Sequence, residues 1–300
     1  MGSCDEWASA KSTLSYPKMI SLQQALTRAT SQLSAHPELR PTALPDAALL
    51  LMHTLQIERA TLIAHPERTL DREQQAAYQR LLERRLRFEP IQYILGETEF
   101  YGLTLHVTPA VLIPRPETEL LVESVLTRLE RHNQLQIADI GTGSGAIAIA
   151  LAHLLPLSVT AIDLSPEALA IASENAHTHR VADRISFLQS DLLAAVPSET
   201  LFDAIVSNPP YIPQSDAPTL HPQVRDHEPA QALFAGADGL TIYQRLIPQA
   251  LAHLQPNGLL ALEIGFGQRD DLAALLDGWG EVEFLLDLQQ IPRVALARRP

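Results

Sequence analysis

The sequence predicts an α/β protein with a doubly wound, mostly parallel sheet that follows a small helical bundle. From residue 136 onward, short apolar runs of strand length alternate with longer segments of helical periodicity, as in repeated βαβ units. Before residue 96 the apolar residues repeat at helical spacing, and prolines separate the repeats. A glycine-rich turn follows the first predicted strand, as is typical of sheets that bind a nucleotide-like ligand.

Composition allows one large domain or two ordinary ones. The chain has 300 residues, of which 46% are hydrophobic, so a sizeable core is expected. Its net charge of −13 argues against a general duplex DNA binder, which needs a basic surface. The charge is uneven, because residues 18–95 carry 10 Lys and Arg against 8 Asp and Glu, whereas residues 115–300 carry 11 against 23. This asymmetry suggests two modules with different partners.

Cysteine usage and hydropathy predict a cytoplasmic protein without a membrane anchor. The only cysteine is Cys4, so no disulfide can form within the chain, which suits a reducing compartment. No apolar run reaches membrane-spanning length, and the N-terminus lacks a signal-peptide pattern. Glu6 stands where a myristoylation pattern needs Ser or Thr. We expect residues 1–18 to be a disordered tail.

Four helices are predicted within residues 19–95, which we interpret as a helical domain. Ser21 is the expected N-cap of the first, Asp46 caps a second over 47–55, a short third covers 61–64, and Asp71 opens a longer one. Residues 96–113 alternate like strands around a glycine and predict a β-hairpin linker. Residues 114–300 then hold the sheet. Seven strands are expected in that part, over residues 136–140, 159–163, 185–189, 202–206, 259–264, 282–286 and 294–297.

The loop after the strand at residues 202–206 is the strongest candidate site. Two consecutive prolines end this strand, and Pro209 pushes Asn208 into an extended conformation. The Asn208 side-chain carbonyl and the Pro209 backbone carbonyl can accept both hydrogens of a planar NH₂ group, with Tyr211 stacked on its plane. Such bonds favour the electron-rich nitrogen that develops when an amide or exocyclic amine attacks a strong electrophile. The alternative is a proline-stiffened loop with a capping Asn.

The glycine-rich turn is the candidate cofactor site. It comprises Gly141, Thr142, Gly143, Ser144 and Gly145. The turn fits both a GxGxG pattern and the GxGxx(G/A) pattern of dinucleotide-binding proteins. Asp163 ends the next strand, where an acid commonly holds ribose hydroxyls. Asp139 precedes the turn and favours a cationic sulfonium cofactor over a pyrophosphate, or else serves as a hydrogen-bond partner of the turn.

Arg115 lies between two prolines, close to the start of the sheet domain. The sequence leaves two roles open for it, a salt bridge with Glu119 and a contact to substrate. The eleven histidines show no convincing metal spacing, and the pair His177 and His179 is interpreted as part of a solvated helix end. No metal site is therefore predicted.

Taken together, the motifs resemble the PrmC/HemK family of S-adenosylmethionine-dependent methyltransferases. The resemblance runs from about residue 19 to the end of the chain and is carried by residues 113–119, 139–145, 163, 190–192, 208–211 and 224–229. Members of this family methylate the side-chain nitrogen (N5) of the glutamine in the Gly-Gly-Gln motif of peptide chain release factors. The resemblance implies their fold, a seven-stranded doubly wound methyltransferase sheet with an N-terminal helical bundle and a β-hairpin linker.

The same resemblance implies a role for each matching residue. S-adenosylmethionine would contact Asp139, Gly141, Thr142, Gly143, Ser144, Gly145, Asp163, Asp191, Leu192 and Asn208. Leu192 stands where many relatives carry an aromatic residue beside the adenine. The glutamine amide would be held by Asn208, Pro209, Pro210 and Tyr211, with Phe100 of the hairpin closing the pocket. Asn208, Pro209 and Tyr211 would be the catalytic residues, and the helical domain would recognise the release factor.

Two other functions remain open from the sequence. An adenine-N6 or other nucleic-acid methyltransferase would use the same tetrapeptide, because the adenine amino group is also a planar NH₂. Such an enzyme needs a basic recognition surface, which the acidic sheet domain lacks in bulk, so no direct nucleic-acid binding is expected. A non-catalytic cofactor sensor is the second alternative. We expect a monomer.

Overall fold

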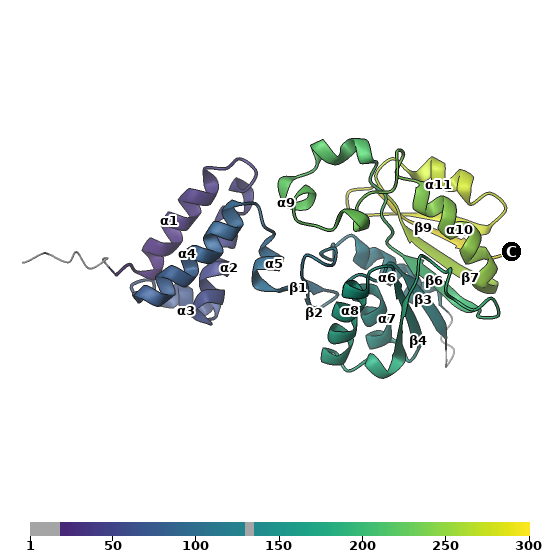
Figure 1. The fold of residues 1–300 in the computed structure, drawn as a ribbon, viewed down its shortest axis with the longest axis horizontal. Coiled ribbons are helices and arrows are strands. Elements are labelled where there is room, and N and C mark those ends of the chain that lie inside the picture. The colour runs from purple at the N-terminus through teal and green to yellow at the C-terminus, as the bar shows by residue number, and fades with distance from the viewer. Residues whose placement is uncertain (1–18, 130–134) are drawn as a thin grey trace, which may run out of the picture. The chain divides into compact units, whose positions relative to one another are not determined.

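The computed structural model describes residues 19–129 and 135–300. It divides into two compact units, with the division between Arg87 and Phe88 (Figure 1). The predicted tail at residues 1–18 lies outside the described residues. No helix of the described part is long and apolar enough to cross a membrane.

The first unit consists of helices. They are α1 (Leu22–Ser34), the short 3-10 helix η1 (Arg40–Thr42), α2 (Ala43–Leu55), α3 (Arg59–Ala64) and α4 (Arg72–Leu86). Ser21 caps α1 and Asp71 caps α4, and each forms a reciprocal capping box with the glutamine three residues later. Both predicted N-caps are therefore confirmed.

The predicted N-cap at Asp46 is wrong. Helix α2 begins three residues earlier, at Ala43, so Asp46 lies inside its first turn. There the buried Asp46 carboxylate accepts hydrogen bonds from the Thr42 hydroxyl at 2.8 Å and from Arg85 Nε of α4 at 2.7 Å. An internal ion pair, which short-range sequence patterns cannot show, determines its position.

The second unit begins with α5 (Ile91–Leu95) and the predicted hairpin, β1 (Glu97–Phe100) and β2 (Leu103–His106). Asn175 of α8 (Pro166–Thr178) is a buried side chain that bonds to the hairpin. Its Oδ1 accepts from the His106 backbone N–H at 2.7 Å, while its Nδ2 donates to the carbonyls of His106 and Ser144. Asn175 thus ties the hairpin to the glycine-rich turn.

Seven strands form one sheet, as predicted, in the order β5-β4-β3-β6-β7-β9-β8. They are β3 (Gln136–Ile140), β4 (Ser158–Asp163), β5 (Ile185–Gln189), β6 (Phe202–Ser207), β7 (Leu254–Glu263), β8 (Gly280–Leu286) and β9 (Pro292–Arg298). The first five in this order are parallel, and β9 runs antiparallel to β7 and β8. The strand order reverses at β3, and ligands bind at such a switch point, outside the carboxyl ends of the strands.

Helices cover both faces of the sheet (Figure 1). Alternate residues of β3 show the two sides, because Ile137 belongs to one buried cluster and Ala138 to the other. The first cluster contains apolar residues of α6 (Thr118–Arg128), α7 (Ala146–Leu154) and α8, and the second those of α10 (Thr241–His253) and α11 (Arg269–Leu275). The segment between β6 and α10 holds only short helices, η3 (Gln214–Thr219), α9 (Pro222–Arg225) and η4 (Ala230–Ala232).

Candidate active site

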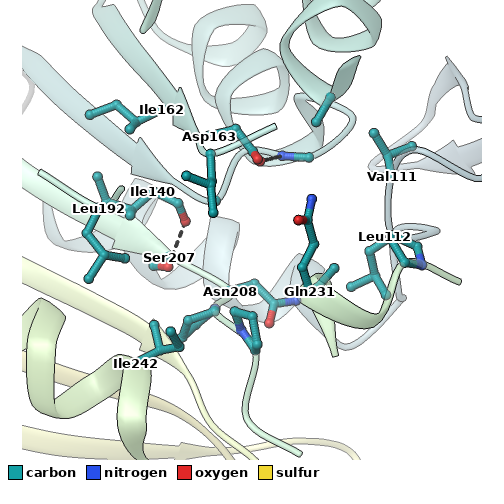
Figure 2. A pocket seen from close by; sticks show the side chains of 18 of the residues that line it. Val111, Leu112, Ile140, Ile162, Asp163, Leu192, Ser207, Asn208, Gln231 and Ile242 are labelled. Carbon is teal, nitrogen blue, oxygen red and sulfur yellow. Dashed lines mark hydrogen bonds between the residues drawn. The ribbon is translucent and has the colours of Figure 1, made fainter. Parts of the chain in front are cut away.

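A cavity opens at the carboxyl ends of β3, β4 and β6 (Figure 2). The glycine-rich turn and the loop after β6 form two of its walls. Figure 2 shows Asp163 and Asn208 on opposite sides of this cavity, with Gln231 of η4 reaching in between them. The glycine-rich turn and the Asn208 loop, which the sequence assigned to cofactor and substrate, therefore line one cavity.

Each glycine of the turn has a positive φ angle, but their surroundings differ. A Cβ built on Gly145 would lie 2.9 Å from the Ile149 side chain and 3.1 Å from Ala172 Cβ, so this glycine allows α7 and α8 to approach. A Cβ on Gly141 would meet nothing within 4 Å, and one on Gly143 only a backbone oxygen at 4.0 Å. Gly141 and Gly143 both line the cavity, so their missing side chains leave room for a ligand.

Asp139 lies behind the turn and is fully buried. Its Oδ2 accepts from the Thr142 hydroxyl at 2.7 Å and from the Ala148 backbone N–H at 3.2 Å. Burial raises the pKa of this carboxyl to about 7, against the lowering effect of these two hydrogen bonds. The Asp139 carboxylate thus braces the turn, and it is not among the residues that line the cavity. The alternative role given to it from the sequence is the one that its contacts support.

Asp163 is held in place by the backbone N–H groups of Gly143 and Ser165. Its Oδ2 accepts from Gly143 N at 2.9 Å, and its Oδ1 accepts from Ser165 N at 2.9 Å. Each carboxylate oxygen keeps a further lone pair for a ligand hydroxyl. Asp191 also lines the cavity, but its carboxylate forms an exposed ion pair with Arg245 at 2.6 Å.

Apolar side chains make up much of the remaining wall. Ile140, Ile162, Leu192 and Ile242 line the cavity (Figure 2). Leu192 adopts a left-handed backbone conformation with φ of 54°, which is costly for a branched residue and marks a constrained turn. Among the described residues that line the cavity, none is Lys or Arg. A sulfonium would therefore meet no positively charged side chain in this wall.

Asn208 is fixed by hydrogen bonds that cross the fold. Its Nδ2 donates to Thr118 Oγ1 at 3.1 Å, and Thr118 in turn donates to Glu263 Oε2 at 2.6 Å. The Tyr211 hydroxyl donates to the other oxygen of Glu263 at 3.4 Å. Thr118 is 4% exposed and Glu263 2%, so this chain of bonds is shielded from water.

A second, smaller cavity adjoins the first at Asn208 and Pro209, which line both. Tyr211 and Arg115 line only the smaller one, and Pro210 lines only the larger one. The loop after β6 thus separates a space beside the glycine-rich turn from a space beside Tyr211. Two reactants entering from the two cavities would meet at Asn208.

Arg115 does not pair with Glu119. Its guanidinium lies 2.5 Å from Oε1 of the buried Glu228, and the other oxygen of Glu228 accepts from the Ile113 backbone N–H at 3.4 Å. Glu119 instead accepts from the Tyr101 backbone N–H at 2.8 Å. Because Glu228 is 113 residues away in the sequence, neighbouring positions gave no signal of this partner. The pair joins the segment before α6 to the loop-rich segment before α10.

Phe100 does not line either cavity beside Asn208, contrary to the prediction from the resemblance. Its ring is 1% exposed and belongs to the buried cluster that includes Leu121 and Val125 of α6. Together with the fully buried Leu105, this ring attaches the short hairpin to the sheet domain. We therefore remove Phe100 from the candidate site.

Sequence reasoning also missed Glu263 and the position of Gln231. Glu263 ends a run of four apolar residues in β7, and an acid at a buried strand position requires a hydrogen-bonding partner. That signal was present in the sequence. Gln231 carried no comparable signal, since its side chain reaches the cavity only because the loop-rich segment folds back over the sheet edge.

Comparisons with known proteins identify the family of this chain. The family models described as PrmC N-terminal domain and Methyltransferase small domain match residues 24–96 and 116–223. A release factor glutamine methyltransferase of Koribacter versatilis is 44% identical over 282 residues, which cover 94% of this chain and 99% of that protein. This chain belongs to the release factor glutamine methyltransferase family. The family predicted from the motifs is thereby confirmed.

A second relative and a solved structure extend the comparison. The release factor glutamine methyltransferase of Coxiella burnetii is 42% identical, with 94% of this chain and all of that protein covered. The 16S rRNA methyltransferase RsmC of T. thermophilus, solved with AdoMet and guanosine, aligns over 68% of this chain and 50% of its own length. Its TM-score is 0.53 at 21% identity, which supports the methyltransferase fold alone.

The site residues fit S-adenosylmethionine, the cofactor expected for this family. Gly141 and Gly143 leave an open cradle, and Asp163 offers acceptors for ribose hydroxyls. Apolar side chains form a wall suited to an adenine ring, and no described Lys or Arg repels a sulfonium from the cavity wall. Thr142, Ser144 and Gly145 shape the turn from outside the lining, so their part in binding is indirect here.

Proposed function

We propose that this chain transfers a methyl group from S-adenosylmethionine to the side-chain amide nitrogen of the glutamine in the Gly-Gly-Gln motif of peptide chain release factors. The observation that carries the proposal is 44% identity over nearly the full length of a release factor glutamine methyltransferase. The adenine-N6 alternative is not favoured, because the curated relatives named here are protein methyltransferases.

Asn208 and Pro209 supply the contacts to the amide. The Asn208 NH₂ group is taken up by Thr118, so its Oδ1 is available to accept one hydrogen of the substrate amide. The backbone carbonyl of Pro209 accepts the second, and Tyr211 packs against the amide plane from the smaller cavity. These bonds orient the nitrogen and increase its electron density as it attacks.

When bound, S-adenosylmethionine supplies a methyl group made electrophilic by its sulfonium. The amide nitrogen held by Asn208 and Pro209 would accept this methyl group with loss of one proton to water, and the sulfur would leave as a neutral thioether. No strong base is needed, so positioning by Asn208 and Pro209 supplies most of the acceleration. We assign Asp163 to the ribose hydroxyls, Leu192 and Asp191 to the adenine edge, and the glycine-rich turn to the methionine part.

The helical domain is the proposed recognition module for the release factor. Its charge balance differs from that of the acidic sheet domain, as expected if it contacts a different partner surface. We further propose that the protein acts in the cytoplasm as a monomer and binds its protein substrate without direct contact to nucleic acid.

Mass spectrometry of a release factor incubated with the purified protein and S-adenosylmethionine tests this function. We expect a mass gain of one methyl group on the motif glutamine, and none when that glutamine is replaced by alanine. Methyl transfer to DNA or RNA in parallel reactions, with an unmodified release factor, would contradict the proposal.

A further inference from the structure

The hydrogen bonds behind Asn208 have a defined direction. The Thr118 hydroxyl has a single hydrogen, which it donates to Glu263 at 2.6 Å. Thr118 can therefore only accept from Asn208, and the end of the Asn208 amide that faces it must be the NH₂ group. Among the residues that the structure describes, none donates to Asn208 Oδ1.

The direction of these hydrogen bonds depends on the protonation state of Glu263, the last acceptor in the series. An ionised carboxylate only accepts hydrogen bonds, so it takes the Thr118 hydrogen and also that of Tyr211. A neutral carboxylic acid can donate instead. The Thr118 hydroxyl is then free to donate to Asn208, and the amide can turn so that its carbonyl faces Thr118.

We propose that Glu263 acts through Thr118 as a positioning residue that selects which end of the Asn208 amide is presented to the substrate. This inference rests on the proposed function, since it assumes that Asn208 Oδ1 holds the substrate NH₂ group. With Glu263 ionised, the carbonyl of Asn208 faces the substrate. With Glu263 neutral, the reversed amide presents a donor to another donor, and the substrate amide is not held.

The surroundings of Glu263 place this change within an accessible pH range. The pKa of its carboxyl is raised to about 7, chiefly by burial and to a lesser extent by the charge of Glu117. The hydrogen bonds from Thr118 and Tyr211 and the charge of Arg293 on β9 lower it. On the α10 side the Tyr243 hydroxyl donates to the Glu263 backbone carbonyl. Burial holds the pKa of the Tyr243 hydroxyl well above its usual value, so Tyr243 stays neutral.

A buried acid at this position needs a reason beyond packing. A leucine or glutamine would fill the same space in β7 without the cost of burying a charge. The simplest alternative is that Glu263 only attaches β7 to α6 through Thr118. That structural role would lower stability and cofactor affinity together with turnover, whereas a positioning role lowers turnover without a change in cofactor affinity.

Substitutions of Thr118 separate these roles. Thr118→Val keeps the shape of the side chain and removes both hydrogen bonds, so we expect kcat to fall roughly tenfold or more while the cofactor Kd stays near that of the wild type. The Tm should fall as well, because the buried Glu263 carboxylate loses a hydrogen-bond donor. Thr118→Ser restores the hydroxyl and should regain most of the loss. Thr127→Val is the matched control, because Thr127 is on the same helix and its hydroxyl bonds only to the helix backbone and Arg128.

The pH profile of Glu263→Gln gives the second test. For the wild type we expect kcat to fall as the pH drops through about 7, since the neutral acid loses control of the Asn208 amide. The glutamine side chain of this variant cannot ionise, so the acid limb should disappear, with a lower kcat throughout. Retention of the limb in Glu263→Gln, or a wild-type kcat in Thr118→Val, overturns the inference. A wild type that leaves the release factor glutamine unmodified would instead overturn the proposed function.

Discussion

The two walls of the active-site cavity are built in different ways. The glycine wall, Gly141–Gly145 with Asp163, is mostly backbone, and its hydrogen-bond partners lie within two consecutive βα units. The amide wall, Asn208 and Pro209 with Thr118 and Glu263, is made of side chains that lie 90 and 145 residues apart in sequence.

This difference separates two tasks. The backbone of the glycine wall is positioned by its neighbouring strands and helices, and its shape admits a cofactor with few contacts from the rest of the chain. The amide wall must orient one side-chain group, and long-range hydrogen bonds within a buried region provide that orientation. Changes in the glycine wall should therefore alter cofactor affinity, and changes in the amide wall should alter turnover.

The largest expected effect comes from Asn208→Ala. Loss of the acceptor should reduce kcat by roughly 100- to 1,000-fold, because the substrate nitrogen is no longer held. Cofactor Kd, measured by calorimetry, should change little, since the glycine wall is untouched. A variant that keeps wild-type turnover would show that Asn208 has no part in the reaction.

Two glycine substitutions sharpen the comparison within the glycine wall. Gly145→Val places its side chain against Ile149 and Ala172 and should lower the free energy of unfolding by about 3 kcal/mol or more. Gly143→Val has a similar backbone strain, but its side chain points to open space beside the cavity. Compared with Gly145→Val, it should therefore weaken cofactor binding more and reduce the free energy of unfolding less. Thermal melts with and without S-adenosylmethionine would distinguish the two. Equal losses of stability and affinity in both variants would contradict the division of roles.

The ion pair of Arg115 and Glu228 should contribute an intermediate effect. Arg115→Ala leaves the buried Glu228 carboxylate without its cation and should cost about 3 kcal/mol of folding stability. Glu228→Gln added to Arg115→Ala should recover part of this loss, because the uncompensated charge is removed. Denaturant unfolding of the two single variants and the double variant tests this, and strict additivity would argue against the pair.

The last prediction concerns the pH dependence of stability. Asp139 has a pKa raised from 3.8 to about 7, so the folded protein holds its proton over a pH range in which the unfolded chain has lost it. Stability should therefore decline as the pH rises from about 4 to about 7 and then level off. Asp139→Asn should make this decline shallower in urea titrations, although Glu263 still contributes a similar slope. An unchanged slope would indicate that Asp139 keeps its ordinary pKa.

Much of the fold followed from local patterns. Periodicity and turn residues located the seven strands, and the capping residues Ser21 and Asp71 began their helices as predicted. The failures, at Asp46, Arg115 and Phe100, share a cause. Each side chain has a partner or a burial site that is distant in sequence, and no local pattern encodes it.

The sequence alone determined the family, the glycine-rich turn and the Asn208 loop, because each depends on contiguous residues whose backbone preferences are intrinsic to glycine and proline. Only the tertiary structure decided that these two motifs share one cavity and that Thr118 and Glu263 stand behind Asn208. Parallel strands far apart in the chain must first be brought to one sheet edge before their terminal side chains can meet.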